Sequence, residues 1–166
     1  LAALFARERH DEALAYIRRQ WGMMLDAGAT TWWEEFHGKS SRCHAWSIGP
    51  TVDLMTQFLG VEAAEPGFAS VRVAPHLGDL KWAKGVVPTP RGDIAVNWQR
   101  ADAGLILHVS APSAVTLEIT LPAGAQDALR LNGEPLRDDQ IKSRTGDSVT
   151  LKSLPGGGYA VDALWV

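Results

Sequence analysis

This 166-residue sequence has a single cysteine, no long hydrophobic run and no cluster of positive charge. Cys43 cannot form an intramolecular disulfide, so the fold must rest on packing, and the cellular compartment stays undecided. No apolar stretch reaches the roughly 18 residues that a membrane-spanning helix needs. With a net charge of -3 and no run of Lys or Arg longer than two, the chain has no electrostatic basis for binding nucleic acid or an anionic membrane. We therefore expect neither partner.

The beginning of the sequence has neither an initiator Met nor a helix-capping residue. Residue 1 is Leu rather than Met, and residues 1–6 resemble the last turns of a helix without a capping residue before them. The charged region and cleavage signature of a signal peptide are absent from these residues. We interpret this start as a cut within a longer protein; removal of an initiator Met or of a leader is the alternative.

Apolar residues at spacings of three and four predict an amphipathic helix over residues 11–25. Asp11 can cap its start. Thr31 with Glu34 three positions later fits a capping box, which predicts a short helical turn near Trp32. A further helix is expected from Pro50, a residue favoured at the first helical position, and Gly60 can close it.

After residue 66 the hydrophobic pattern changes to two-residue alternation, which is typical of strands with one buried face. The alternating residues are Val71, Val73, Ile94, Val96, Trp98, Leu105, Leu107, Val109, Val115, Leu117, Ile119 and Leu121. Short turns separate these runs, and Asn132-Gly133 predicts a hairpin. Because no helical crossover lies between them, we expect every strand pair to be antiparallel. The predicted fold class is α+β: a helical segment over residues 1–66, then an antiparallel β-sandwich of roughly seven to nine strands over residues 67–166.

Carboxylates, a histidine and aromatic rings are concentrated in the helical segment. Trp32-Trp33-Glu34-Glu35 is followed, ten residues after Glu34, by His44-Ala45-Trp46. A glycosidase needs acidic side chains to move protons and activate water, and aromatic and polar groups to hold the sugar ring. This segment is therefore the predicted functional site.

Three strings carry a resemblance to a known family. They are Thr30-Thr31-Trp32-Trp33-Glu34, Cys43-His44-Ala45-Trp46-Ser47-Ile48-Gly49-Pro50 and Glu65-Pro66-Gly67-Phe68. Together they resemble the carboxyl-terminal part of bacterial α-L-rhamnosidases. The resemblance implies that residues 1–66 are the last helices of a catalytic toroid of paired α-helices and that residues 67–166 are its C-terminal β-sandwich.

The same resemblance implies inverting hydrolysis of a terminal α-L-rhamnosyl bond and assigns roles to residues. Glu34 matches the general base; its alternative role is a helix-capping glutamate. Glu35 is a weaker candidate, because consecutive side chains point to different sides of the chain, and is placed among the substrate contacts. His44 matches a histidine that contacts the sugar, although family members commonly have a longer segment before it. Trp33 or Trp46 could form an apolar wall for the sugar's methyl face.

Partners and alternatives follow from this interpretation. The general acid is implied to lie in earlier toroid helices, so we expect the 166-residue chain alone to be inactive. The expected partners are a rhamnose-containing glycoside and, through the apolar helix stripes, a second copy of the chain. No residue spacing suggests a metal site or a cofactor, so none is expected.

A sugar-binding or purely structural β-sandwich is the competing hypothesis. Exposed aromatic residues on strands would favour sugar binding. We expect Trp21, Trp82, Trp98 and Trp165 to be packed in the core, which argues against it.

Overall fold

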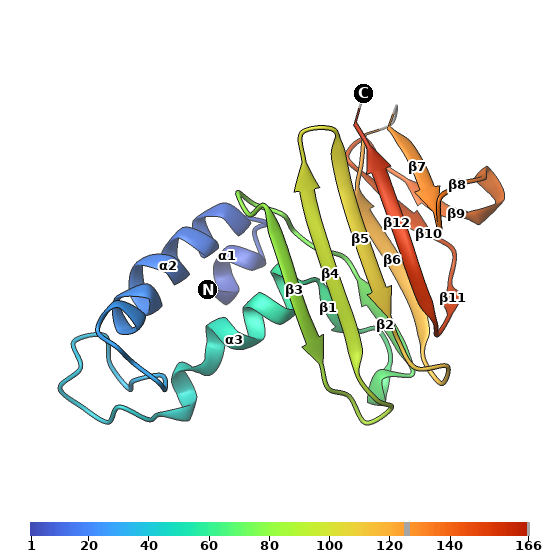
Figure 1. Ribbon diagram of the computed structural model, residues 1–166. Coiled ribbons are helices and arrows are strands. Elements are labelled where there is room, and N and C mark those ends of the chain that lie inside the picture. The colour runs from blue at the N-terminus through green and yellow to red at the C-terminus, as the bar shows by residue number, and fades with distance from the viewer. Residues whose placement is uncertain (125–126, 166) are drawn as a thin grey trace. The chain divides into compact units, whose positions relative to one another are not determined.

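The computed structural model describes residues 1–124 and 127–165, which fall into two compact units. The first unit is Leu1–Leu54 and the second runs from Met55 to the end of the chain. The first contains the helices α1 (Ala2–Phe5), α2 (His10–Asp26) and α3 (Gly49–Asp53), with a 3-10 turn at Ala45–Ile48 (Figure 1). No helix among the described residues is long and apolar enough to cross a membrane.

Helix α2 confirms the helix predicted from apolar spacing. It buries Ala13, Leu14, Ile17 and Met24 along one side. The predicted cap was wrong, because Arg9 precedes the helix and makes no capping bond with its side chain. Asp11 lies inside the first turn instead, where its negative charge suits the positive end of the helix dipole.

The helical turn predicted near Trp32 does not form. The Thr31 hydroxyl donates to the carbonyl of Arg42 instead of capping a helix. The two limbs of this loop bond to each other through their backbones: the Glu34 N–H donates to the Ser41 carbonyl at 2.8 Å, and the His44 N–H donates to the Trp32 carbonyl at 2.9 Å. These pairings take up the backbone groups that a helix would have used.

Helix α3 begins at Gly49, one residue before the predicted start at Pro50, and continues into a π-helical turn at Leu54–Phe58. Gly60 follows with a φ of +84°, a conformation that favours glycine. A Cβ at this position would lie 2.4 Å from the backbone nitrogen of Pro75. Gly60 therefore ends the helix, as predicted, and also permits a close approach of two chain segments.

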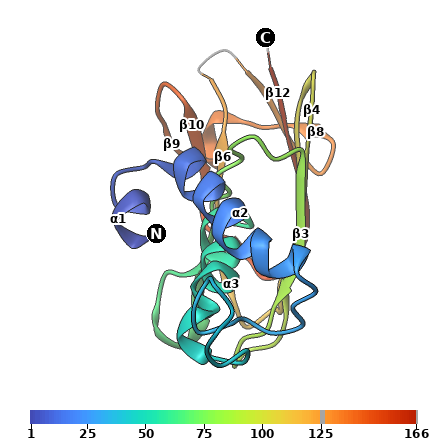
Figure 2. The same ribbon diagram turned by 90° about the vertical axis from the view of Figure 1, so that its left-hand side faces the viewer.

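The second unit is built from two β-sheets. Its strands are β1 (Val61–Ala63), β2 (Ser70–Val73), β3 (Trp82–Val87), β4 (Ile94–Ala101), β5 (Gly104–Ser110), β6 (Thr116–Pro122), β7 (Ala128–Leu131), β8 (Glu134–Pro135), β9 (Ile141–Arg144), β10 (Ser148–Leu151), β11 (Leu154–Pro155) and β12 (Gly158–Leu164). One sheet has the order β1-β2-β6-β10-β9, with β11 also paired to β6, and the other has the order β3-β4-β5-β12-β7-β8. Figure 2 shows the sandwich edge-on, with β6, β9 and β10 in one layer and β3, β4 and β12 in the other.

The α+β class and the sandwich are confirmed, with three differences in detail. The described residues after residue 66 form eleven strands, β2 to β12, where seven to nine were predicted. Strand β1 precedes residue 67, so the first sheet begins earlier in the sequence than the pattern suggested. The expectation of purely antiparallel pairing was wrong, because β2 and β6 pair in parallel from Ser70↔Thr116 to Val73↔Ile119. Strands β3 to β5 of the opposite sheet supply the long connection that a parallel pair requires, so no helix is needed.

Alternating residues of both sheets form one hydrophobic core. All twelve residues singled out by two-residue alternation are buried in it. Trp98 is fully buried, and its indole N–H donates to the Phe58 carbonyl at 2.8 Å. Trp82 is 65% exposed, so its predicted burial was wrong. Trp82 pairs with Gln99, whereas Trp98 pairs with Ala83, so the two indoles lie on opposite faces of the sheet.

A hairpin turn at Asn132-Gly133 and the burial of Trp21 and Trp165 can also be compared with the predictions. The predicted hairpin at Asn132-Gly133 joins β7 to β8, and both residues have positive φ values, 53° and 84°. That combination is the one a type I′ turn requires. Trp21 and Trp165 are half-buried.

Candidate functional site

Glu34 is held at the loop between α2 and the turn at Ala45–Ile48. Its backbone carbonyl accepts the Trp46 indole N–H at 3.2 Å, and its carboxylate Oε2 accepts the Ser41 N–H at 3.2 Å. Its side chain is still 30% exposed. The loop thus fixes the position of this carboxylate and leaves part of it open to solvent.

His44 and Trp46 lie beside Glu34. The His44 Nε2 is 3.8 Å from Glu34 Oε1, which is too long for a direct hydrogen bond but close enough for electrostatic interaction. The rings of His44 and Trp46 lie with their centroids 4.4 Å apart, and Trp46 is 70% exposed. His44 Nδ1 is buried and has no hydrogen-bond partner in the described part of the chain. Three of the predicted site residues are therefore brought together as a Glu34, His44 and Trp46 cluster.

Trp33 and Glu35 take other positions. The Trp33 side chain is only 8% exposed and lies against Gly38, where a Cβ would come within 2.9 Å of the indole. The Arg42 guanidinium lies 5.1 Å from the Trp33 ring centroid. Trp33 therefore packs inside the loop and has little surface to offer a ligand.

Glu35 is engaged in a local contact on another side of the loop. Its Oε2 lies 2.8 Å from His37 Nε2 and also accepts a hydrogen bond from the Ser40 hydroxyl. Adjacent glutamates thus differ in environment: Glu34 faces His44, whereas Glu35 faces His37. This difference favours Glu34 for chemistry that involves the cluster.

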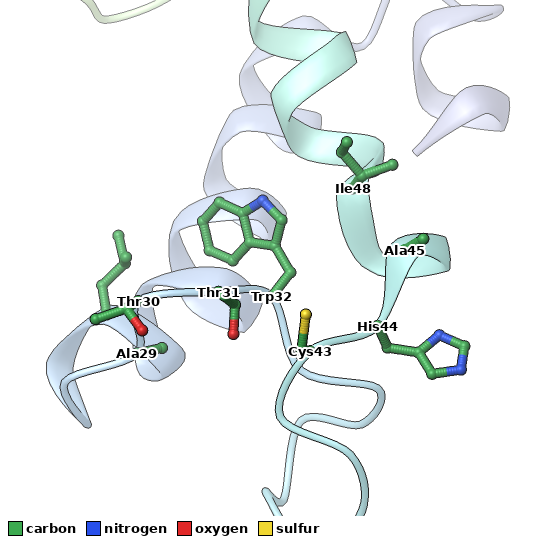
Figure 3. A pocket seen from close by; sticks show the side chains of 9 residues that line it. Ala29, Thr30, Thr31, Trp32, Cys43, His44, Ala45 and Ile48 are labelled. Carbon is green, nitrogen blue, oxygen red and sulfur yellow. The ribbon is translucent and has the colours of Figure 1, made fainter.

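A mainly apolar cavity of about 450 Å³ lies next to the cluster (Figure 3). Its lining consists of Leu25, Ala29, Thr30, Thr31, Trp32, Cys43, His44, Ala45 and Ile48. The imidazole of His44 points away from the side chains of Trp32 and Ile48, so His44 borders the cavity while its ring belongs to the cluster (Figure 3). The Trp32 indole N–H donates to the Thr51 hydroxyl at 2.9 Å, which fixes the ring.

Sequence reasoning did not single out this cavity. Its signal was the Trp32-Trp33 pair, in which one indole packs inside the loop and the other lines the cavity. Among residues 1–124 and 127–165, no group of three or more His, Cys, Asp or Glu side chains could hold a metal ion. The cluster offers one fixed carboxylate, one imidazole and one exposed indole, a set that can accept a proton and contact a sugar.

Comparison with known proteins identifies the family. Residues 60–134 match the model of the bacterial alpha-L-rhamnosidase C-terminal domain. An alpha-L-rhamnosidase of Alteromonas sp. is 30% identical over 132 residues, which cover 70% of this chain and 14% of that protein. The chain belongs to the bacterial α-L-rhamnosidase family. A second family member, from Formosa agariphila, is 25% identical over 126 residues, covering 69% of this chain and 14% of its own length.

Solved structures of rhamnosidases agree with this family assignment. A GH78 family rhamnosidase of Bacillus sp. GL1 is 38% identical, with a TM-score of 0.67, over 73% of this chain and 14% of that one. The α-L-rhamnosidase of Dictyoglumus thermophilum shares the fold, with a TM-score of 0.72 at 23% identity, over 86% of this chain and 17% of that one. The chain spans about 14% of the length of the curated relatives named above.

Proposed function

We propose that this chain is the carboxyl-terminal portion of a glycoside hydrolase that removes terminal α-L-rhamnose from glycosides with inversion. The observation that carries the proposal is the fixed, partly exposed Glu34 carboxylate beside His44 and the exposed Trp46 indole. Three related proteins are alpha-L-rhamnosidases, which supports the substrate class. A related enzyme from Streptomyces avermitilis was crystallised in complex with L-rhamnose.

In the proposed reaction, Glu34 takes a proton from a water molecule as the water oxygen attacks the anomeric carbon. A carboxylic acid on the opposite side of the sugar protonates the leaving oxygen, and the glycosidic C–O bond breaks. The anomeric configuration is inverted, because the water enters opposite the departing group. This acid is proposed to lie outside the 166 residues, so the chain alone is expected to be inactive.

The other two members of the cluster are proposed to hold the sugar. The His44 side chain is 34% exposed, and its Nε2, beside Glu34, can form a hydrogen bond with a rhamnose hydroxyl. The exposed Trp46 indole gives a flat apolar surface for the methyl side of the ring. These contacts would orient the anomeric carbon toward Glu34.

The test is Glu34→Gln in the longer protein that supplies the toroid helices. Gln keeps the shape and can still accept the Ser41 N–H, but it cannot take up a proton, so kcat should fall by roughly 10²- to 10⁴-fold. The melting temperature should change little. Glu35→Gln is the matched control and should retain most of the activity. Equal losses for the two variants, or release of rhamnose by the isolated 166-residue chain, would contradict the proposal.

A further inference from the structure

The outer faces of the two sheets use their polar side chains differently. On the sheet that contains β2 and β6, Arg72 lies 3.4 Å from Glu62 and 3.9 Å from Glu118, so the charges are paired with one another. On the opposite sheet, Lys84, Asn97 and His108 form one row across β3, β4 and β5. Their side chains make no hydrogen bond or ion pair with any described residue. The side chains of this row can therefore form hydrogen bonds with a ligand.

A hollow of about 460 Å³ lies along this row. Its floor includes small residues, because Ala95, Ser110 and Gly158 lie side by side across β4, β5 and β12. The longer side chains of Lys84 and His108 stand in the adjacent row. A volume of this size is in the range of small-ligand sites, and a sugar ring fits within it.

An exposed indole stands on the same face. Trp82 lies two residues before Lys84 on β3 and belongs to the next row, opposite Gln99. At 65% exposure its ring offers solvent a flat apolar surface with one donor, which is the surface a sugar ring stacks on. Trp82 was predicted to be buried, which argued against sugar binding; its exposure removes that argument for this residue.

The charged residues around the hollow favour acidic sugars over neutral ones. Its lining includes Lys84 and His108 but no Asp or Glu. A carboxylate placed there would gain a charge-assisted hydrogen bond from Lys84, and nothing in the lining would repel it. Asn97 and His108 can both donate to and accept from hydroxyl groups.

We propose that the outer face of the β3-β4-β5-β12 sheet binds an acidic saccharide, with a uronate carboxylate at Lys84 and hydroxyls at Asn97 and His108. The sugar ring lies over the floor of Ala95 and Gly158, and a neighbouring ring stacks on Trp82. This binding requires no hydrolysis and does not depend on the proposed role of Glu34.

The test is calorimetric titration of the 166-residue chain with an oligosaccharide of alternating L-rhamnose and galacturonic acid. Saturable binding is expected, and it should weaken when the carboxylates are reduced to alcohols or when salt is raised. Inorganic phosphate should not compete, because it lacks the ring that the floor and Trp82 hold. Absence of saturable binding, equal binding of the reduced oligosaccharide, or full competition by phosphate would overturn the proposal.

Variants locate the site. Lys84→Gln should weaken binding about three- to five-fold, as expected for an exposed ion pair, and should abolish the preference for the acidic form. Lys152→Gln, an exposed lysine outside the hollow, is the matched control and should leave affinity unchanged. Ser110→Trp, on an exposed position of the floor, should fill the hollow and prevent binding while circular dichroism stays the same. Equal affinities for Lys84→Gln and Lys152→Gln would place the saccharide elsewhere.

One further variant separates this proposal from the proposed hydrolysis. Glu34→Gln should leave the titration of the acidic oligosaccharide unchanged, because Glu34 lies in the other compact unit. If Glu34→Gln removed the binding, the saccharide would occupy the loop cluster and the sheet-face proposal would fail. If binding survived but the longer Glu34→Gln protein kept its hydrolytic activity, only the proposed function would fail.

Discussion

The helical unit and the sandwich differ in how completely they cover their apolar side chains. In the sandwich, alternate residues of both sheets meet in one core that includes the fully buried Trp98. In the helical unit several large apolar side chains are exposed: Met23, Leu25, Trp46, Ile48, Val52 and Leu54. Exposed apolar surface of this kind is typical of an interaction site. The sandwich exposes Trp82, Val86, Ile106 and Leu164 as well, but it is the larger unit and has a closed core. The smaller helical unit exposes more large apolar side chains and therefore has surface left for a partner.

The two proposed sites follow the same division. The Glu34 cluster lies on an irregular loop, fixed by hydrogen bonds such as that from Trp46 to the Glu34 carbonyl. The hollow at Lys84 and His108 lies on a regular sheet, whose opposite face packs against the core. A loop brings distant residues together with unusual geometry, while a sheet presents residues in rows at regular spacing.

The largest expected effect tests the core of the sandwich. Trp98→Ala should lower the free energy of unfolding by about 3–5 kcal/mol, because it leaves a cavity and removes the bond to the Phe58 carbonyl. Trp82→Ala is the matched control on the outer face and should change it by less than about 0.5 kcal/mol. Urea unfolding followed by circular dichroism measures both. Similar losses for the two variants would mean that Trp82 is buried in solution and that the outer face is covered.

A medium effect tests the exposed surface of the helical unit. We expect the 166-residue chain to self-associate through this surface at micromolar concentration. Leu25→Lys should weaken the association roughly tenfold, because the free energy of burying one leucine side chain is lost. Leu25 is 58% exposed. Val86→Lys, a site on the sandwich with 56% exposure, is the control and should have no effect. Light scattering over a concentration series gives the result. A monomer at all concentrations, or an equal change in association for the two variants, would contradict the expected role of the helical surface.

The smallest expected effect is a pH dependence at Asp53. Burial raises the pKa of this carboxyl above its usual value of 3.8. The folded state therefore binds the proton more tightly than the unfolded state, so stability should fall as the pH rises from about 3.8 through the folded pKa. Asp53→Asn should flatten this decline, and Asp102→Asn, at an exposed turn, should not. Carboxyl NMR titration with urea unfolding at stepped pH values measures both; an Asp53 midpoint at or below 3.8 would show the sign to be wrong.

Much of the fold could be predicted because local periodicity reports burial directly. The spacing of Leu14, Ile17 and Met24 predicted α2, and two-residue alternation identified the buried residues of β4, β5 and β6. Trp82 shows the limit of that reasoning. An isolated aromatic residue near the start of a strand gives no phase by itself, and the pairing of β3 with β4 decided which face it occupies.

The candidate site could be predicted from the sequence only in part. Glu34, His44 and Trp46 were selected by residue type and family resemblance, and the structure brings them together. The capping interpretation of Thr31 failed, because a capping box and a loop-closing hydroxyl have the same sequence pattern. The cavity beside Trp32 depends on contacts between limbs of a loop, which no local pattern encodes.

The sequence by itself determined the family, the helix predicted over residues 11–25 and observed over 10–26, and the buried faces of β4, β5 and β6, because these depend on residue identity and on spacing along one segment. Only the tertiary structure decided which segments pair. It set β2 parallel to β6, turned Trp82 to solvent, and aligned Lys84, Asn97 and His108 in one row. The physical reason is that backbone pairing between distant segments fixes the register, and the register fixes the side to which each side chain points.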